Sequence, residues 1–175
     1  MKSILKEISV ESIVLDKDNP RLKFSKIERG IKHWKENEVE EVIKESQSFN
    51  RLKESIKEYG VIDPVWVHEL GDEKFEVVEG NMRITALRGL IEEKTTKADG
   101  IDYHKVMAHI IPKETSKTQL EVQKAVLQTG KNPWGAFNEA AHIFDLFSVH
   151  SLGISEIASM LGKSLSYVKN EIENF

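Results

Sequence analysis

The stretch VVEGNMRITAL at residues 77–87 most constrains the fold, because it ends a strand and begins a helix within a few residues. Its β-branched valines stop at Glu79 and Gly80, Asn81 can cap the helix, and Arg83 follows two residues later. The first amides of a helix have no intrahelical partner, and its N-terminus carries about half a positive charge. A glycine lets an anion approach these amides, and an arginine adds a planar pair of donors. The residues therefore predict either a phosphate-binding turn or an ordinary strand-to-helix turn with a solvated arginine.

The segments before this turn predict a small sheet with helices packed beside it. An amphipathic helix over residues 52–59 ends at Gly60 and runs directly into a strand. A turn at residues 70–73 then leads to a second strand, which ends at residue 78. Nearer the start of the chain, an edge strand is predicted to close at the Asn-Pro turn of residues 18–21.

Three boxes in this order resemble the ParB/sulfiredoxin superfamily: DNPR at residues 18–21, SIKEYGVIDPVWV at 55–67 and EGNMRITALRGL at 79–90. The resemblance covers most of residues 4–112. It implies an α+β fold, with a ParB/sulfiredoxin-like small mixed sheet and helices in a domain over residues 1–112. It also implies that a nucleotide, CTP or ATP with Mg²⁺, binds through its phosphates at Gly60, Gly80, Asn81 and Arg83.

Two departures from the superfamily pattern bear on the chemistry. ParB proteins typically carry Gly-Glu-Arg-Arg where this chain has Gly80-Asn81-Met82-Arg83, so the acid and one arginine are missing. Sulfiredoxins attack with a cysteine thiolate in this loop, and the chain has no cysteine, which excludes sulfiredoxin chemistry. Some superfamily members hydrolyse or transfer nucleotide phosphates, and Glu79 could serve such an enzyme as a catalytic base or hold Mg²⁺.

Residues 113–175 are predicted to form an all-helical domain. Within it, apolar residues recur at three- and four-residue steps, which is the spacing of a core-facing stripe on one helix. The members of this stripe are Phe137, Ala140, Ala141, Phe144 and Phe147.

Residues 153–173 read as two helices joined by a tight turn. Ala158, Gly162 and Val168 have the spacing of a helix-turn-helix, which needs a small residue where its helices cross, a glycine in the turn and an apolar residue under the second helix. Ser164 would cap that second helix. The segment also resembles the helix-turn-helix that follows the nucleotide domain in ParB proteins. Either it is a hairpin that only packs, or it contacts DNA phosphates and bases. The DNA-binding residues would then be Lys163, Ser164, Ser166, Tyr167, Lys169 and Asn170.

Two further segments allow alternative interpretations. The linker at residues 127–133 lies where ParB relatives carry a Glu-Asn-x-x-Arg box for nucleotide phosphates. Lys131 and Asn132 could replace that box, or they could simply form a turn between helices. The charged insertion at residues 25–48 predicts one or two helices, interpreted either as a lid or partner-binding arm or as a surface helix docked through Trp34.

Composition and charge limit the classes of protein to which the chain can belong. The net charge of −4 argues against nonspecific DNA binding by the whole surface, although a local basic face would still bind. No apolar run approaches the ~20 residues that a membrane-spanning helix needs, so a cytoplasmic protein without a membrane partner is expected. The six histidines include no His-x-x-x-His pair, and no metal site is predicted.

Two classes of function follow. The first is a ParB-like DNA-binding or regulatory protein of the partition or transcription type, a homodimer by resemblance, gated by a nucleotide at residues 80–83. The second is a small nucleotide-dependent enzyme of the same superfamily, a phosphotransferase, NTPase or nuclease that uses Glu79. A nucleotide-free interaction module is a third alternative. The chain stops at Phe175, inside or just after the second predicted helix, so it is either a fragment of a longer protein or a minimal relative.

Overall fold

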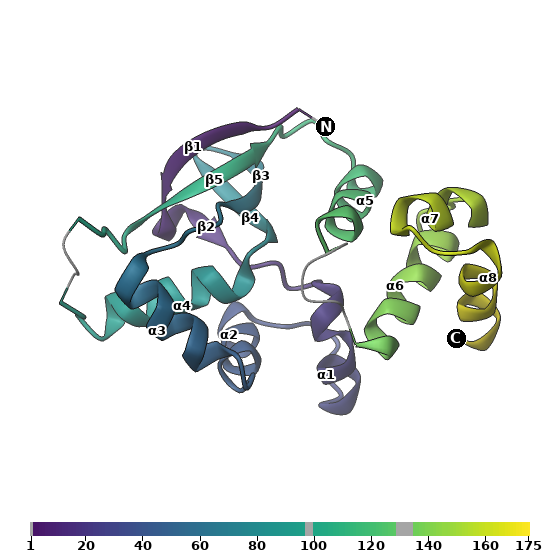
Figure 1. Ribbon diagram of the computed structural model, residues 1–175, viewed down its shortest axis with the longest axis horizontal. Coiled ribbons are helices and arrows are strands. Elements are labelled where there is room, and N and C mark those ends of the chain that lie inside the picture. The colour runs from purple at the N-terminus through teal and green to yellow at the C-terminus, as the bar shows by residue number, and fades with distance from the viewer. Residues whose placement is uncertain (1, 97–99, 129–134) are drawn as a thin grey trace. The chain divides into compact units, whose positions relative to one another are not determined.

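The computed structural model of the chain describes residues 2–96, 100–128 and 135–175 (Figure 1). The chain divides into two compact units. Unit 1 comprises Met1–Lys17 and Trp34–Glu114, and unit 2 comprises Asp18–His33 and Thr115–Phe175. Each unit is described by itself.

Unit 1 is built on a five-stranded mixed sheet with the order β1-β5-β3-β4-β2. The antiparallel pairs are β1 with β5 and β3 with β4, and the parallel pairs are β3 with β5 and β2 with β4. The small mixed sheet expected from the sequence is confirmed. The strands are β1 (Ile4–Ser9), β2 (Ile13–Val14), β3 (Val65–Gly71), β4 (Lys74–Glu79) and β5 (Lys105–Ile111).

The helices of unit 1 pack beside this sheet (Figure 1). A short 3₁₀ helix, η1 (Val10–Ser12), separates β1 from β2. The α-helices α2 (Glu36–Lys44), α3 (Phe49–Tyr59) and α4 (Asn81–Glu92) contact one another. Helix α4 buries a mainly apolar set of residues, among them Ile84, Leu87 and Leu90. The fully enclosed side chains include Ile13, Leu15, Ile84, Leu87, Leu90 and Ile111.

The turns that the sequence predicts after α3 and between β3 and β4 are present in unit 1. Helix α3 ends at Gly60, whose positive φ of 74° is open to glycine and rarely to other residues. The two residues between β3 and β4, Asp72 and Glu73, both have positive φ, as a two-residue hairpin requires. In unit 2, Asn19 accepts a hydrogen bond from the amide of Arg21 and so opens the predicted Asn-Pro turn.

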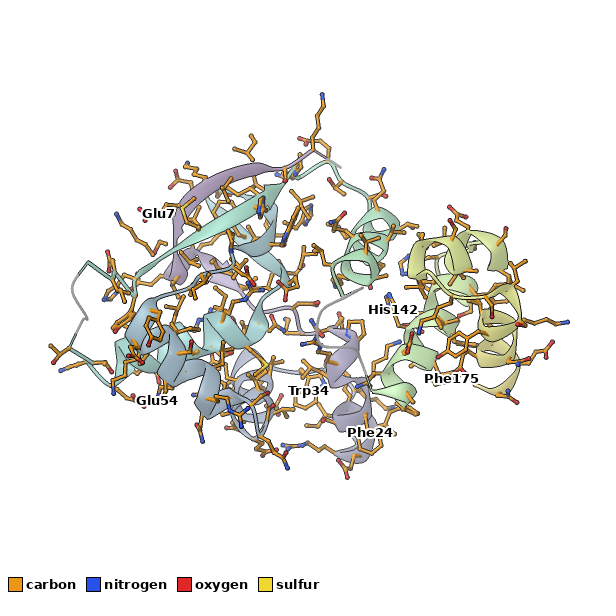
Figure 2. All side chains as sticks on the ribbon, viewed as in Figure 1. Glu7, Phe24, Trp34, Glu54, His142 and Phe175 are labelled. Carbon is orange, nitrogen blue, oxygen red and sulfur yellow. The ribbon has the colours of Figure 1, made fainter. Side chains whose placement is uncertain are left out.

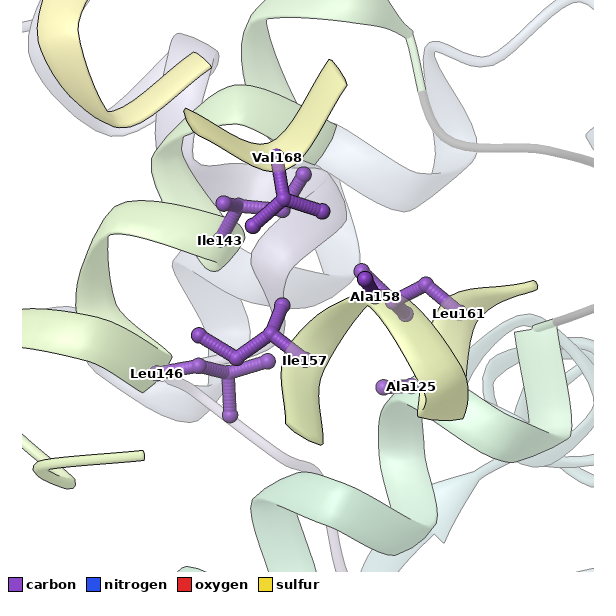
Figure 3. Packing of buried hydrophobic residues seen from close by; sticks show 7 residues of the cluster. All are labelled: Ala125, Ile143, Leu146, Ile157, Ala158, Leu161 and Val168. Carbon is purple, nitrogen blue, oxygen red and sulfur yellow. The ribbon is translucent and has the colours of Figure 1, made fainter. Parts of the chain in front are cut away.

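The described part of unit 2 is helical, as expected for the end of the chain. Its elements are the 3₁₀ helix η2 (Pro20–Leu22) and the α-helices α1 (Lys23–Glu28), α5 (Lys117–Gln128), α6 (Ala136–Ser148), α7 (Ile154–Leu161) and α8 (Leu165–Asn174). Small and branched apolar side chains from α5 to α8 meet in one cluster (Figure 3). Its members are Ala125, Ile143, Leu146, Ile157, Ala158, Leu161 and Val168.

Residues 18–33 belong to unit 2, whereas the sequence placed them within a first domain of residues 1–112. The Lys23 ammonium forms an ion pair with Asp145 on α6. The amide of Phe24 donates to the Asn138 side chain over 3.1 Å. The boundary at residues 112 and 113 stays a prediction, and the structure adds that the predicted insertion at 25–48 is divided between the two units.

The predicted core-facing stripe on α6 is right for Ala141, which is buried, and wrong for the phenylalanines at its two ends. Phe137 and Phe147 are each 40% exposed, while Ile143 and Leu146 are buried. The phenylalanine face instead carries aromatic contacts: the centre of the Phe137 ring lies 5.7 Å from that of Phe24 and 5.6 Å from that of Phe175. The helix is apolar on two sides, and three- and four-residue spacing alone does not show which side meets α7 and α8.

Candidate functional site

The turn between β4 and α4 depends on Gly80. Its φ of 126° lies in a region that residues with a side chain rarely adopt, and a Cβ built on it would lie 2.7 Å from Val65 Cγ1. Gly80 is also the N-cap of α4 and supplies no side-chain cap. The prediction that Asn81 caps the helix is therefore wrong: Asn81 is the first helical residue, and its side chain is used elsewhere.

Asn81 ties the start of α4 to a distant part of unit 1. Its side chain is 8% exposed, accepts a hydrogen bond from the amide of Asp16 over 3.0 Å and donates one to the Asp16 carbonyl over 2.9 Å. Both polar ends of the amide are engaged with main chain. Asn81 can therefore contribute its own backbone N–H to an anion, while its side chain holds the turn in place.

Arg83 is held by acceptors on two segments. Its guanidinium donates to the carbonyl of Asp63 over 2.6 Å and to that of Pro64 over 3.1 Å, and it forms an ion pair with Glu79. The side chains of Arg83 and Glu79 are each only 12% exposed. The arginine thereby joins the end of β4 and the start of α4 to the loop that begins at Gly60.

This arrangement suits the binding of an anion better than catalysis by Glu79. The amides of residues 81–83 lie in the first turn of α4, where no intrahelical partner exists and no side chain caps them. Arg83 has five N–H donors, and two of its nitrogens already donate to protein acceptors. The Glu79 carboxylate is already engaged in an ion pair with that cation.

Within the described ranges, no group of three or more His, Cys, Asp or Glu side chains is placed to hold a metal. Mg²⁺ in nucleotide sites is commonly held by one or two carboxylates together with phosphate oxygens, so this finding is compatible with a nucleotide-borne ion. The predicted phosphate contacts Lys131 and Asn132 lie outside the described residues.

The sequence interpretation missed Arg88, which organises the other end of this region. The Arg88 guanidinium donates to Glu36 over 2.8 Å and also to Glu40 and to the carbonyl of Ile13. Glu36 in turn accepts from the amide of Leu15. The network joins α4, α2 and the segment around β2. Only the position of Arg88 inside the EGNMRITALRGL box hinted at a role, and nothing near it identified its partners.

The helices α7 and α8 form a hairpin closed by local contacts. Gly162 has the left-handed φ of 63° that ends α7, and the amide of Lys163 donates back to the Ala158 carbonyl over 3.0 Å. The Ser164 hydroxyl accepts from the amide of Tyr167 over 3.1 Å, which confirms the predicted cap of α8. Val168 and Ala158 are buried, as the predicted packing of the two helices requires.

The residues predicted to contact DNA lie on the outer side of this hairpin. All six are exposed except Tyr167, which is half-buried. Lys169 has Glu173 at 3.7 Å, a loose pair with both side chains mostly in solvent. Lys163 has Glu139 of α6 at 2.7 Å. The face therefore carries two lysines in different electrostatic settings.

A buried histidine lies inside unit 2 (Figure 2). Burial, followed by the positive charges of Lys23, Lys124 and His150, lowers the pKa of His142 to about 3. His142 Nδ1 lies 3.9 Å from a Glu121 oxygen. The imidazole is therefore neutral near pH 7.

None of the helices in the described part of the chain combines the length and the apolar character that a membrane span needs.

A model of the family described as the ParB N-terminal domain matches residues 1–108 of the chain. The match extends over more than half of the sequence and includes the Gly80 turn, and the chain belongs to the ParB N-terminal domain family. No curated protein matches the chain.

Solved structures of ParB proteins are among those that match the chain. One is the C-terminally truncated chromosome-partitioning protein ParB from Caulobacter crescentus complexed with CTP-γ-S, with 19% identity, a TM-score of 0.45, and 97% of this chain and 77% of that chain covered. The same truncated protein complexed to the centromeric parS site has 16% identity and a TM-score of 0.48, with 95% and 70% covered. A Pnob8-like ParB-N domain has 12% identity and a TM-score of 0.49, with 99% and 51% covered. CTP-γ-S and parS are ligands of the Caulobacter protein.

Proposed function

We propose that this ParB-family chain is a DNA-binding regulatory or partition protein that contacts DNA through α8 and binds a nucleotide at the start of α4. One observation carries the DNA-binding half. The hairpin of α7 and α8 is fixed by its own cap, turn and buried valine, and this leaves a polar, lysine-containing face exposed. A helix seated in this way can enter the major groove with its first residues near base edges.

The proposed DNA contacts divide by chemistry. Lys163 and Lys169 contact phosphates, which set affinity, and Ser166, Tyr167 and Asn170 lie near base edges, which set sequence preference. Ser164 serves the helix as its cap, so its hydroxyl is already used. The net charge of −4 limits affinity for arbitrary DNA. A homodimer bound to a two-fold symmetric site would add the contacts of a second α8.

The DNA-binding proposal is tested with the full chain and a duplex selected from a random pool. Replacing Lys163 and Lys169 together with alanine is expected to reduce the slope of log affinity against log salt by up to ~2, about one for each lost phosphate contact. The matched control replaces Lys6 and Lys105, two exposed lysines of β1 and β5. An equal slope in the wild type and the α8 variant would refute the role of this helix.

The nucleotide half rests on the uncapped first turn of α4 beside Arg83. The phosphate chain is proposed to accept from the amides of residues 81–83 and to share the Arg83 guanidinium with Glu79. The Arg83→Ala variant is expected to bind CTP with Mg²⁺ more weakly by ~1.5–3 kcal/mol, the range for a charge-assisted hydrogen bond. The control is Arg88→Ala, which loses an ion-pair network on the same helix and leaves the first turn intact.

Calorimetric titration at a temperature where both variants are folded separates these effects. If the parent chain binds neither CTP, ATP nor GTP at millimolar concentration, the nucleotide site is refuted. The enzyme alternative is weaker than nucleotide binding because Glu79, its proposed base, is held in an ion pair with Arg83.

A further inference from the structure

Glu139 forms an ion pair with Lys163, one of the two lysines of the proposed DNA-binding face. It lies in the first turn of α6, and one of its carboxylate oxygens is 2.7 Å from the Lys163 ammonium, in the turn before α8. The Glu139 side chain is 19% exposed and that of Lys163 is 36% exposed. The pair is therefore partly shielded from water, and solvent screens it less than a fully exposed pair.

The Tyr167 ring makes a second contact with the Lys163 ammonium. The Lys163 ammonium lies 4.8 Å from the centre of the Tyr167 ring, within the range of a cation–π interaction. The hydrogen bond to Glu139 raises the pKa of Lys163, and burial followed by the charges of Glu139 and Glu171 raises the pKa of Tyr167. A carboxylate and an aromatic face thus hold one ammonium in a defined position.

The second lysine of this face provides an internal comparison. Lys169 and Glu173 are 3.7 Å apart and 63% and 59% exposed, so water and salt screen their attraction strongly. A DNA phosphate can displace Glu173 at little cost. At Lys163 the phosphate has to displace a closer carboxylate, and it also meets the negative charge that this carboxylate leaves behind.

We propose that Glu139 is a built-in competitor of the DNA backbone, which occupies the Lys163 ammonium in the free protein and lowers the affinity of α8 for DNA. This inference rests on the proposed DNA-binding function. Glu139 lies outside the hairpin of α7 and α8, and under this proposal it sets the hairpin's affinity for DNA and the salt dependence of that affinity. A carboxylate that selects against weakly contacted sites in this way favours specific over nonspecific binding, because only a well-placed phosphate recovers Lys163.

The test measures DNA affinity of the full chain over a salt series for Glu139→Gln, which keeps the size of the side chain and removes its charge. This variant is expected to bind the selected duplex about 5- to 10-fold more tightly at low salt, with a salt slope steeper by about one unit, because Lys163 gains a phosphate contact. The control Glu173→Gln removes the same charge beside Lys169 and is expected to change affinity less than ~2-fold.

A double-variant cycle decides whether the effect passes through Lys163. In a Lys163→Ala background, Glu139→Gln is expected to change the affinity no more than Glu173→Gln does. An equal gain from both glutamine variants in the wild-type background would overturn the proposal, since it would show a general charge effect. Affinity unchanged by Glu139→Gln would overturn it as well.

Two further comparisons keep the test decisive. If Glu139→Gln fails to fold by circular dichroism, Glu139→Ala is used with the same expected gain. If Lys169→Ala leaves DNA affinity and salt slope unchanged, the proposed function of α8 has failed. If Lys169→Ala weakens binding while Glu139→Gln has no effect, only the role of Glu139 has failed.

Discussion

The first turn of α4 follows Gly80 directly and that of α8 begins three residues after Gly162, yet their polar side chains are used in opposite ways. At α4, Asn81 and Arg83 bond to main-chain groups far away in the sequence and are nearly buried. At α8, Ser164 caps its own helix, and the polar residues after it are exposed or half-buried. The polar groups at the start of α4 are therefore bonded within unit 1, whereas most of those on α8 are exposed.

The difference shows that residue type alone does not separate a structural group from a binding group. Asparagine occurs in both places, at Asn81 and Asn170, and only its surroundings differ. Substitutions at the start of α4 are therefore expected to reduce stability, and substitutions on α8 are expected to reduce binding with little loss of stability.

The largest effect is expected from Gly80→Ala. The new Cβ would meet Val65 Cγ1 at 2.7 Å and would force a backbone of φ 126°, so strain and overpacking act together. Urea unfolding is expected to show a loss of ~3–5 kcal/mol. The control is Gly100→Ala, which has φ of 83° and nothing within 4 Å of its Cβ, and so carries the backbone term alone. Equal losses at the two glycines would contradict the close contact at Gly80.

Asn81→Leu is expected to have the next largest effect. It keeps the approximate size of the side chain and leaves the amide and carbonyl of Asp16 without their present partner, at a cost of ~2–4 kcal/mol. Asn170→Leu is the control on the exposed helix and is expected to stay within ~0.5 kcal/mol of the wild type. Similar losses in the two variants would remove the contrast between the two turns.

His142 is expected to make the stability of unit 2 depend on pH. Its pKa is about 3 in the folded chain and about 6.5 when unfolded, so the unfolded state binds more protons between these values. The contribution of neutral His142 to the free energy of unfolding is complete above pH 6.5. It falls as the pH decreases toward 3, by at most about 1.4 kcal/mol per pH unit. Urea unfolding of His142→Gln between pH 7 and 4 is expected to show a shallower decline than the wild type. Identical slopes would mean that His142 is not buried in its neutral form.

The smallest effect is expected from Ser164→Ala, which removes the cap of α8 and costs ~1 kcal/mol. Thermal unfolding followed by circular dichroism measures it. Ser166→Ala on the same exposed turn is the control, because the Tyr167 amide donates to the Ser164 hydroxyl, whereas the Ser166 hydroxyl lies 3.1 Å from that of Ser164. A loss at Ser164 as large as that at Asn81 would show that the start of α8 is as tightly integrated as the start of α4.

Local signals in the sequence predicted much of the fold. The mixed sheet, the end of α3 at Gly60, the hairpin between β3 and β4, and the cap of α8 at Ser164 all follow from residues within a few positions of one another. These features are stabilised by local backbone preferences, so the sequence states them directly.

The features that the sequence did not predict depend on contacts between distant residues. Asn81 was assigned as a cap because its partner, the main chain of Asp16, is 65 positions away. The core face of α6 and the attachment of residues 18–33 to unit 2 depend likewise on which helices meet in space. The pairing of Lys163 with Glu139 could not be predicted either, because each residue alone reads as an ordinary surface charge.

Amide NMR of the uniformly ¹⁵N-labelled full chain tests the central claim most directly, because one sample reports on both turns. Titration with CTP and Mg²⁺ is expected to shift the amides of residues 81–83, and titration with the selected duplex is expected to shift those of residues 163–170. Each ligand is expected to act at its own turn, since an anion at α4 contacts backbone N–H groups and DNA at α8 contacts exposed side chains. Saturating duplex that leaves residues 163–170 unshifted while moving other amides would contradict the account.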